Sequence, residues 1–221
     1  MALLEIAPDI APHVRLALFQ AEGVTARGES PTLERDLAAL CARLQEHFAE
    51  PAQAVELFGP ARALYRALGL DPTKTRPSSE ALIRRVITGR GLYRINRVVD
   101  TCNLCSIDLA LPIGLYDTDQ VRWPAVLRRG LEGEGYRGLG KDHVNVGGRY
   151  TLADAEGPFG NPSSDSYRTR IRAETTACTF ILFAPASHAP AALAEELEIC
   201  AERMVRYNGG TIVRREAPGA A

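Results

Sequence analysis

Two cysteines, Cys102 and Cys105, are separated by two residues in the segment VVDTCNLCSIDLALPIG. A structural zinc site needs four ligands, usually as two close pairs, but the other cysteines of this chain are single and no histidine accompanies them. A redox pair needs a reactive thiolate at a helix start after a strand, and the βαβ surroundings of such a pair are missing here. The sequence therefore favours a third interpretation, in which both cysteines pack along one helix.

Two polar residues of the same segment, Asp100 and Asn103, lie three positions apart and share a face if the segment is helical. Either side chain can accept hydrogen bonds from free backbone N–H groups at a helix start, which is a structural role. The Asn103 amide carries both donors and an acceptor, which suits binding of a ribose hydroxyl or a carbonyl. We take both residues as candidate binding residues, with capping as the alternative for Asp100.

The segment RRVITGRGLYRINR holds several arginines, one tyrosine and no acidic residue. Arginine can fork onto phosphates and tyrosine can stack on an unpaired base, so the segment predicts a local RNA-binding patch. The alternative is an ordinary solvated helix face, on which arginine stems cover apolar surface. The arginines in question are Arg84, Arg85, Arg90, Arg94 and Arg97.

The composition describes a globular chain. Its 221 residues are 46% hydrophobic and 24% charged, enough for a normal core in one large domain or two small ones. No apolar run is long enough to span a bilayer and no signal peptide is recognisable, so we expect a cytoplasmic protein that does not bind membranes. Five scattered cysteines fit a reducing compartment. The net charge of −1 excludes a global basic field, so we expect no DNA binding, and any RNA contact must come from a local patch.

Hydrophobic periodicity predicts an α+β fold. A buried strand is expected at 14–19, followed by helices after Ser30, over 55–68 and after Ser78 or Ser79. After Leu111, glycines and prolines divide short runs that predict strands: PIGLYD, AVLRRG, YTLAD, TRIRAETT and TFILFAP. A helix from Pro190 to an NGG turn and a last strand, TIVRRE, end the chain. Helices before the strands and one after them argue against alternating βαβ units.

The loop DPTKTRPSS is rich in turn residues and is the most plausible internal boundary. We therefore expect an N-terminal strand and helices over 1–75, packed on a main domain over 76–221 that includes the C-terminal helix.

The segment NRVVDTCNLCSIDLALPIGLYD resembles the core signature of the tRNA-binding, or editing, domain of the phenylalanyl-tRNA synthetase beta subunit, the B3/B4 domain. The resemblance rests on VVD followed by two residues and Asn103, on a helix leading to a proline, and on YD just beyond. Other motifs lie in the family's order from Arg76 to Phe183: SSEALIRRVITG, VLRRGLEGEGYRGLG, GGRYTLAD and TRIRAETT. The resemblance implies that domain's fold, a mixed, mainly antiparallel sheet with flanking helices.

The resemblance also implies a site. In the synthetase domain the asparagine that matches Asn103 lines the editing pocket, and the glutamate that matches Glu174 helps to recognise the tyrosyl hydroxyl of a mischarged tRNA. We therefore expect Asn103 and Glu174 to be the catalytic residues, with Glu174 on a strand and facing Asn103 across a shared hollow. A site that hydrogen-bonds a hydroxyl discriminates strongly against an analogue that lacks it.

The chain departs from the family pattern at two places. Gly114 occupies the position of a pocket histidine, and FGNPSSDSYRTR replaces the glycine-rich loop that cups the substrate. Ester hydrolysis can still proceed with water held between backbone donors and polar side chains. Gly114, Ser164 and Asp165 are accordingly candidate substrate-binding residues, together with Asp100. A polar surface turn is the alternative for Ser164 and Asp165.

The resemblance implies a free-standing protein that binds tRNA or another structured RNA and hydrolyses a mischarged aminoacyl group in trans. No Walker-type phosphate loop or ATP-binding motif is recognisable, so we expect no cofactor, no metal and no ligase activity. Two alternatives stay open. One is a non-catalytic RNA-binding module, and the other is a pocket for a free amino acid or another small metabolite.

Overall fold

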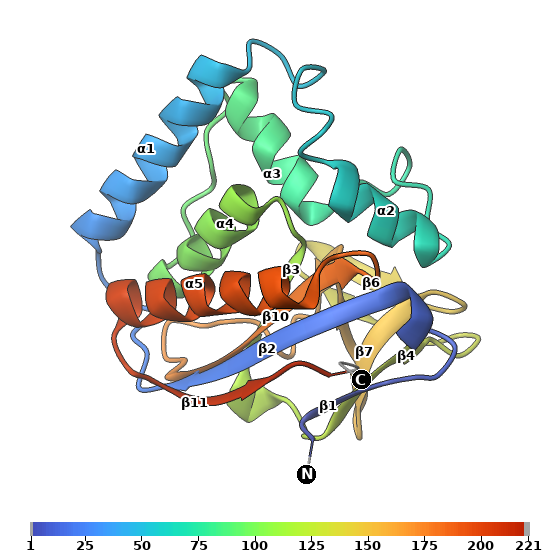
Figure 1. Cartoon of the computed structure of the whole chain (residues 1–221). Helices are drawn as coiled ribbons and strands as arrows, with labels where there is room; N and C mark the ends of the chain where they lie inside the picture. Colours follow the sequence, from blue (N-terminus) through green and yellow to red (C-terminus); the bar gives the residue numbers. More distant parts are fainter. Residues whose placement is uncertain (1, 219–221) are drawn as a thin grey trace.

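The computed structural model describes residues 2–218 (Figure 1). Helices and strands follow one another as β1 (Leu4–Ile6), β2 (Val14–Glu22), α1 (Pro31–His47), α2 (Gly59–Ala67), α3 (Ser78–Ile87), α4 (Arg97–Leu109), β3 (Ile113–Asp117), β4 (Ala125–Arg129), β5 (Gly135–Gly138), β6 (Lys141–Asn145), β7 (Tyr150–Asp154), β8 (Gly157–Asn161), β9 (Ser164–Asp165), β10 (Ala177–Pro185), α5 (Pro190–Asn208) and β11 (Thr211–Glu216).

A four-stranded antiparallel sheet in the order β11-β2-β10-β3 forms the centre of the molecule. Strand β2 contains the predicted strand 14–19 and is buried on both faces. Its residues Ala17, Phe19 and Ala21 pack toward α4 and α5, whereas Leu16 and Leu18 pack toward the second sheet and α2. This alternation follows from the two-residue period of a strand. Figure 1 shows α5 lying along β2.

The second sheet has the order β1-β4-β7-β8-β9. Strand β1 runs parallel to β4, and the remaining pairs of this sheet are antiparallel. With its mixed and antiparallel sheets and separate helices, the structure confirms the predicted α+β class.

Helices α1, α3 and α4 pack together beside the sheets, around an apolar cluster that includes Leu37, Ile83 and Ile107 (Figure 1). Helix α4 carries the signature segment, and both Cys102 and Cys105 are buried along it. The interpretation that these cysteines pack along one helix is therefore confirmed.

Two predicted elements differ from the structure. The helix expected over 55–68 begins only at Gly59, after a series of turns. The strand expected at TRIRAETT is absent: residues 167–176 form bends and a turn before β10. Side chains supply hydrogen bonds here in place of a strand ladder, because the Thr175 hydroxyl accepts from the Arg172 N–H (2.9 Å) and donates to Asp117 (2.6 Å).

The first 75 residues and the last part of the chain share one sheet, because β2 is hydrogen-bonded between β11 and β10. The division at residue 75 stays a prediction. Within residues 2–218, no helix has both the length and the apolar composition needed to cross a membrane.

Candidate functional site

A cavity of about 480 Å³ lies between α3, α4 and β3, with Asn103 in its wall. We call it the Asn103 cavity. Helix α4 contributes Val99, Asn103 and Ser106, which lie on one face because they are spaced by three or four positions. Strand β9 contributes Asp165 from a distant part of the sequence. The fold thus brings two of the predicted site residues, Asn103 and Asp165, to one cavity.

The Asn103 side chain is half-buried and available to a ligand. Its amide makes no hydrogen bond with any residue that the structure describes, whereas neighbouring Ser106 donates to the Leu111 carbonyl at 2.7 Å. A primary amide can donate to one ligand atom and accept from another. Asn103 can therefore orient a polar group in the cavity.

Asp165 supplies a carboxyl group whose Oδ1 is inaccessible to solvent and has no hydrogen-bond partner within residues 2–218. Burial raises the pKa of Asp165 to about 7. The neighbouring Tyr116 hydroxyl lowers this pKa in part, although that hydroxyl makes no hydrogen bond of normal geometry with any described residue. A carboxyl group with such a pKa can both accept and return a proton near neutral pH. Asp165 is therefore the group in this cavity best suited to proton transfer.

The remaining walls are largely apolar, with Leu82, Val99, Ile113 and Ile171 among them. Ser78, the first residue of α3, adds a buried hydroxyl that has no partner among the described residues. The sequence suggested only a capping role for Ser78, because its position at a helix start gives no signal of the cavity. An apolar pocket with a few convergent polar groups is the usual form of a small-ligand site.

Asp100 lies outside the Asn103 cavity and organises the start of α4. Its carboxylate accepts from the Arg94 guanidinium at 2.8 Å and from the Ile95 N–H at 3.1 Å. The cap of α4 is Asn96, whose side chain accepts from the Val99 N–H at 3.0 Å. Asp100 thus holds the segment that places Ile95 at the cavity. It accepts a backbone N–H at the start of α4, as the structural alternative expected, and it does not line the cavity as a substrate-binding residue would.

Gly114 does not line the cavity either, because the Tyr116 side chain occupies the space beside it. A Cβ atom at position 114 would lie 2.6 Å from the Tyr116 hydroxyl oxygen. The Tyr116 ring is fully buried and packs edge-on against Phe159, with ring centroids 5.1 Å apart. A glycine at this position is thus explained by packing.

Ser164 lines an adjoining hollow of about 280 Å³ that shares Ser78, Ile113 and Asp165 with the Asn103 cavity. Its N–H donates to the Asn161 side chain at 2.9 Å, and its carbonyl accepts from the Tyr136 hydroxyl at 2.5 Å. These contacts fix the short strand β9 that carries Asp165.

The expected position of Glu174 is wrong. It lies in a turn, its side chain is 64% exposed, and its carboxylate is 3.8 Å from the exposed guanidinium of Arg27. Hydrogen bonds around Thr175 bend the chain here, so Glu174 projects into solvent and does not face Asn103 across a hollow.

The five arginines of the predicted RNA patch have different environments. Arg84 is bound to Glu80 at 2.7 Å, Arg94 contacts Asp100, and Arg97 donates to the Tyr207 carbonyl. Arg85 stacks on the Tyr93 ring, with its guanidinium carbon 3.9 Å from the centroid, and Arg90 is exposed. Part of the patch therefore stabilises the fold.

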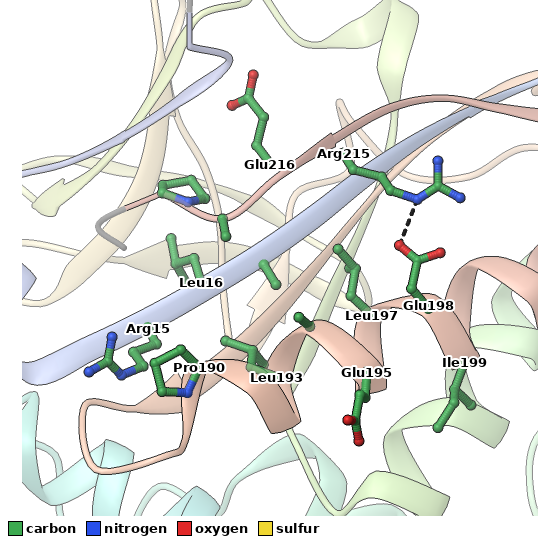
Figure 2. Close-up of a pocket in the computed structure, with 14 residues that line it drawn as sticks. Arg15, Leu16, Pro190, Leu193, Glu195, Leu197, Glu198, Ile199, Arg215 and Glu216 are labelled. Carbon is green, nitrogen blue, oxygen red and sulfur yellow. Dashed lines mark hydrogen bonds and ion pairs between the residues drawn. The ribbon is translucent and has the colours of Figure 1, made fainter. Parts of the chain in front are cut away.

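A separate hollow of about 550 Å³ lies between α5, β2 and β11 (Figure 2). Its walls include Leu16, Leu193 and Leu197, and on its rim Arg215 contacts Glu198 at 2.7 Å. This hollow contains none of the predicted site residues. The Asn103 cavity is the better candidate because two of its buried polar atoms lack partners within the described chain.

The fold and the site together define an α+β protein with an apolar-walled cavity that a few polar side chains enter. Residues 61–213 match the model of the B3/4 domain, and the chain belongs to this family. The family predicted from the signature segment is thus confirmed.

Among solved structures, the chain is similar to an N-terminal fragment of the phenylalanyl-tRNA synthetase beta-subunit from Pyrococcus horikoshii, with 14% sequence identity and a TM-score of 0.44. The match covers 95% of this chain and 49% of the other, so the chain spans about half the length of that fragment. No curated protein matches the chain.

Proposed function

We propose that this B3/4-domain protein binds the acceptor end of an aminoacyl-tRNA, places the aminoacyl group in the Asn103 cavity and hydrolyses its ester bond in trans. The supporting observation is the position of the Asn103 amide and the Asp165 carboxyl group, both free of partners in the described chain, in one apolar-walled cavity. The walls favour an amino acid with an apolar side chain.

In the proposed reaction, ionised Asp165 accepts a proton from a water molecule, whose oxygen attacks the ester carbonyl carbon. The Asn103 amide donates a hydrogen bond to the carbonyl oxygen as it becomes negatively charged. The ester bond then breaks, and the ribose oxygen that leaves takes the proton from Asp165. The products are a free amino acid and an uncharged tRNA. Glu174 takes no part, because its side chain is exposed and paired with Arg27.

Incubation with tRNAs charged with a panel of amino acids tests this proposal. We expect faster deacylation of at least one mischarged tRNA, and a loss of about 100-fold in rate for Asn103→Ala and for Asp165→Asn. The circular dichroism of both variants should match that of the wild type. Tight tRNA binding without faster deacylation would instead identify a non-catalytic RNA-binding module.

A free amino acid or other small metabolite is a second candidate ligand. It is favoured because Arg84, Arg94 and Arg97 of the predicted RNA patch already contact groups of this chain. A ligand that binds only the native state raises the melting temperature. Stabilisation by free amino acids, with no tRNA shift in a gel, would support this candidate and exclude both RNA functions. The cytoplasmic location stays a prediction.

A further inference from the structure

Another hollow, of about 400 Å³ and lined mainly by polar side chains, lies on another face of α3. Arg76, Arg84, Arg85 and Arg90 line it together with Thr88, and no acidic side chain of the described residues contributes to its wall. We call it the arginine hollow. Four guanidinium groups around one space repel one another, and an anion bound between them would offset this repulsion.

The internal charge compensation of the arginine hollow is incomplete. Glu80, with a side chain only 1% exposed, contacts Arg62 and Arg84 at 2.7 Å each and lies 3.9 Å from Arg76. One carboxylate therefore serves three guanidinium groups. Arg85 and Arg90 form no ion pair with any residue in the range 2–218. The group keeps a strong excess of positive charge.

Two of the arginines that line the arginine hollow, Arg84 and Arg85, are held in place by contacts within the chain. Arg84 is fixed by its bond to Glu80, and its guanidinium carbon lies 5.0 Å from the centroid of the Phe58 ring. Arg85 stacks on Tyr93 and donates to the Arg90 carbonyl at 3.3 Å. The Nε atom of Arg85 is buried and has no partner within the described chain. Pre-oriented guanidinium donors suit the oxygens of a phosphate group.

We propose that the arginine hollow binds a backbone phosphate of the RNA strand whose acyl end enters the Asn103 cavity. Helix α3 connects the two places, since Ser78 and Leu82 line the cavity while Arg85 and Thr88 line the hollow. Ser78 and Arg85 are about 10 Å apart along the helix axis, a distance that a short stretch of nucleotides spans. Tyr93, 66% exposed, offers a ring for stacking beside the hollow. The choice of RNA as the source of the phosphate rests on the proposed function.

Binding of uncharged tRNA by the full chain, measured over a series of salt concentrations, tests the proposal. Arg90→Ala and Arg85→Ala should each raise the dissociation constant about tenfold. The plot of log K against log salt should become shallower by about 0.7 per lost phosphate contact. Arg149→Ala is the matched control, because Arg149 is also exposed and lines neither hollow. Tripolyphosphate should compete with tRNA for the wild type.

Unchanged affinity and salt slope in both variants would overturn the proposal. Binding of tripolyphosphate that depends on Arg90, without any tRNA binding, would assign the hollow to a free polyphosphate or nucleotide and overturn the choice of RNA. A failure of the arginine hollow can be distinguished from a failure of the proposed hydrolysis. Charged tRNA that binds through Arg90 but is not deacylated would support the arginine hollow and exclude hydrolysis. Deacylation with an unchanged KM in both variants would support hydrolysis and exclude the arginine hollow.

Discussion

Replacement of Gly114 by alanine tests the packing of the Tyr116 side chain against this position. The new Cβ would lie 2.6 Å from the Tyr116 hydroxyl oxygen and 2.8 and 2.9 Å from two of its ring carbons. The ring cannot simply turn away, because it is fully buried, packs against Phe159, and is equally close to the Cβ position of Gly160 on its other side.

The expected cost combines two opposing effects. Overpacking a buried site costs about 1–3 kcal/mol. The lower chain entropy of unfolded alanine, relative to glycine, returns about 0.4–1 kcal/mol. Gly114→Ala should therefore lower the free energy of unfolding by about 1–2 kcal/mol. A histidine at this position should cost more, because its ring needs the volume that Tyr116 occupies.

Urea unfolding followed by circular dichroism measures this cost. Gly59→Ala is the matched control, since Gly59 begins α2 and has no atom within 4 Å of its Cβ position. It should leave stability unchanged or raise it slightly. In a Tyr116→Leu background, which lacks the three nearest atoms, Gly114→Ala should cost nothing. An equal cost in both backgrounds, or no cost in the wild type, would refute the packing argument.

Three further predictions concern carboxylates. The pKa of Asp165 is raised to about 7 from 3.8, so protonated Asp165 favours the folded state, and its contribution to stability should fall as pH rises from about 4 to 7. The rate of deacylation should rise with pH through about 7, because the reaction needs ionised Asp165. Asp165→Asn should remove both dependences, and pH-dependent unfolding and rate profiles check this. Glu174→Gln should leave deacylation unchanged and alter the free energy of unfolding by less than about 0.5 kcal/mol, because the pair with Arg27 is solvent-exposed; a large rate loss would restore its catalytic role. Asp100→Ala should cost about 2–3 kcal/mol in urea unfolding, since it removes two hydrogen bonds to a buried carboxylate; a normal stability would contradict the role given to Asp100.

Local patterns in the sequence were sufficient for most of the elements and for the family. Helix α1 begins at Pro31, as the proline and the leucine spacing indicate, although the Ser30 side chain makes no capping hydrogen bond. The apolar run at 14–19 lies in the central strand β2. The signature segment forms a helix that presents Asn103 to a cavity. These features depend on neighbouring residues, whose spacing determines which side chains share a face.

The tertiary structure alone decided which polar groups meet. Asp165 reaches the Asn103 cavity from a two-residue strand, and Glu174 leaves it because distant Asp117 binds the loop through Thr175. The environments of the arginines depend equally on partners far along the chain, as with Arg97 and the Tyr207 carbonyl. Hydrogen bonds and ion pairs of this kind join residues that sequence spacing does not relate. The sequence by itself therefore determined most of the helices and strands and the wall of the site that α4 forms. The opposite wall, and which charged side chains stay without a partner, depend on how the chain packs.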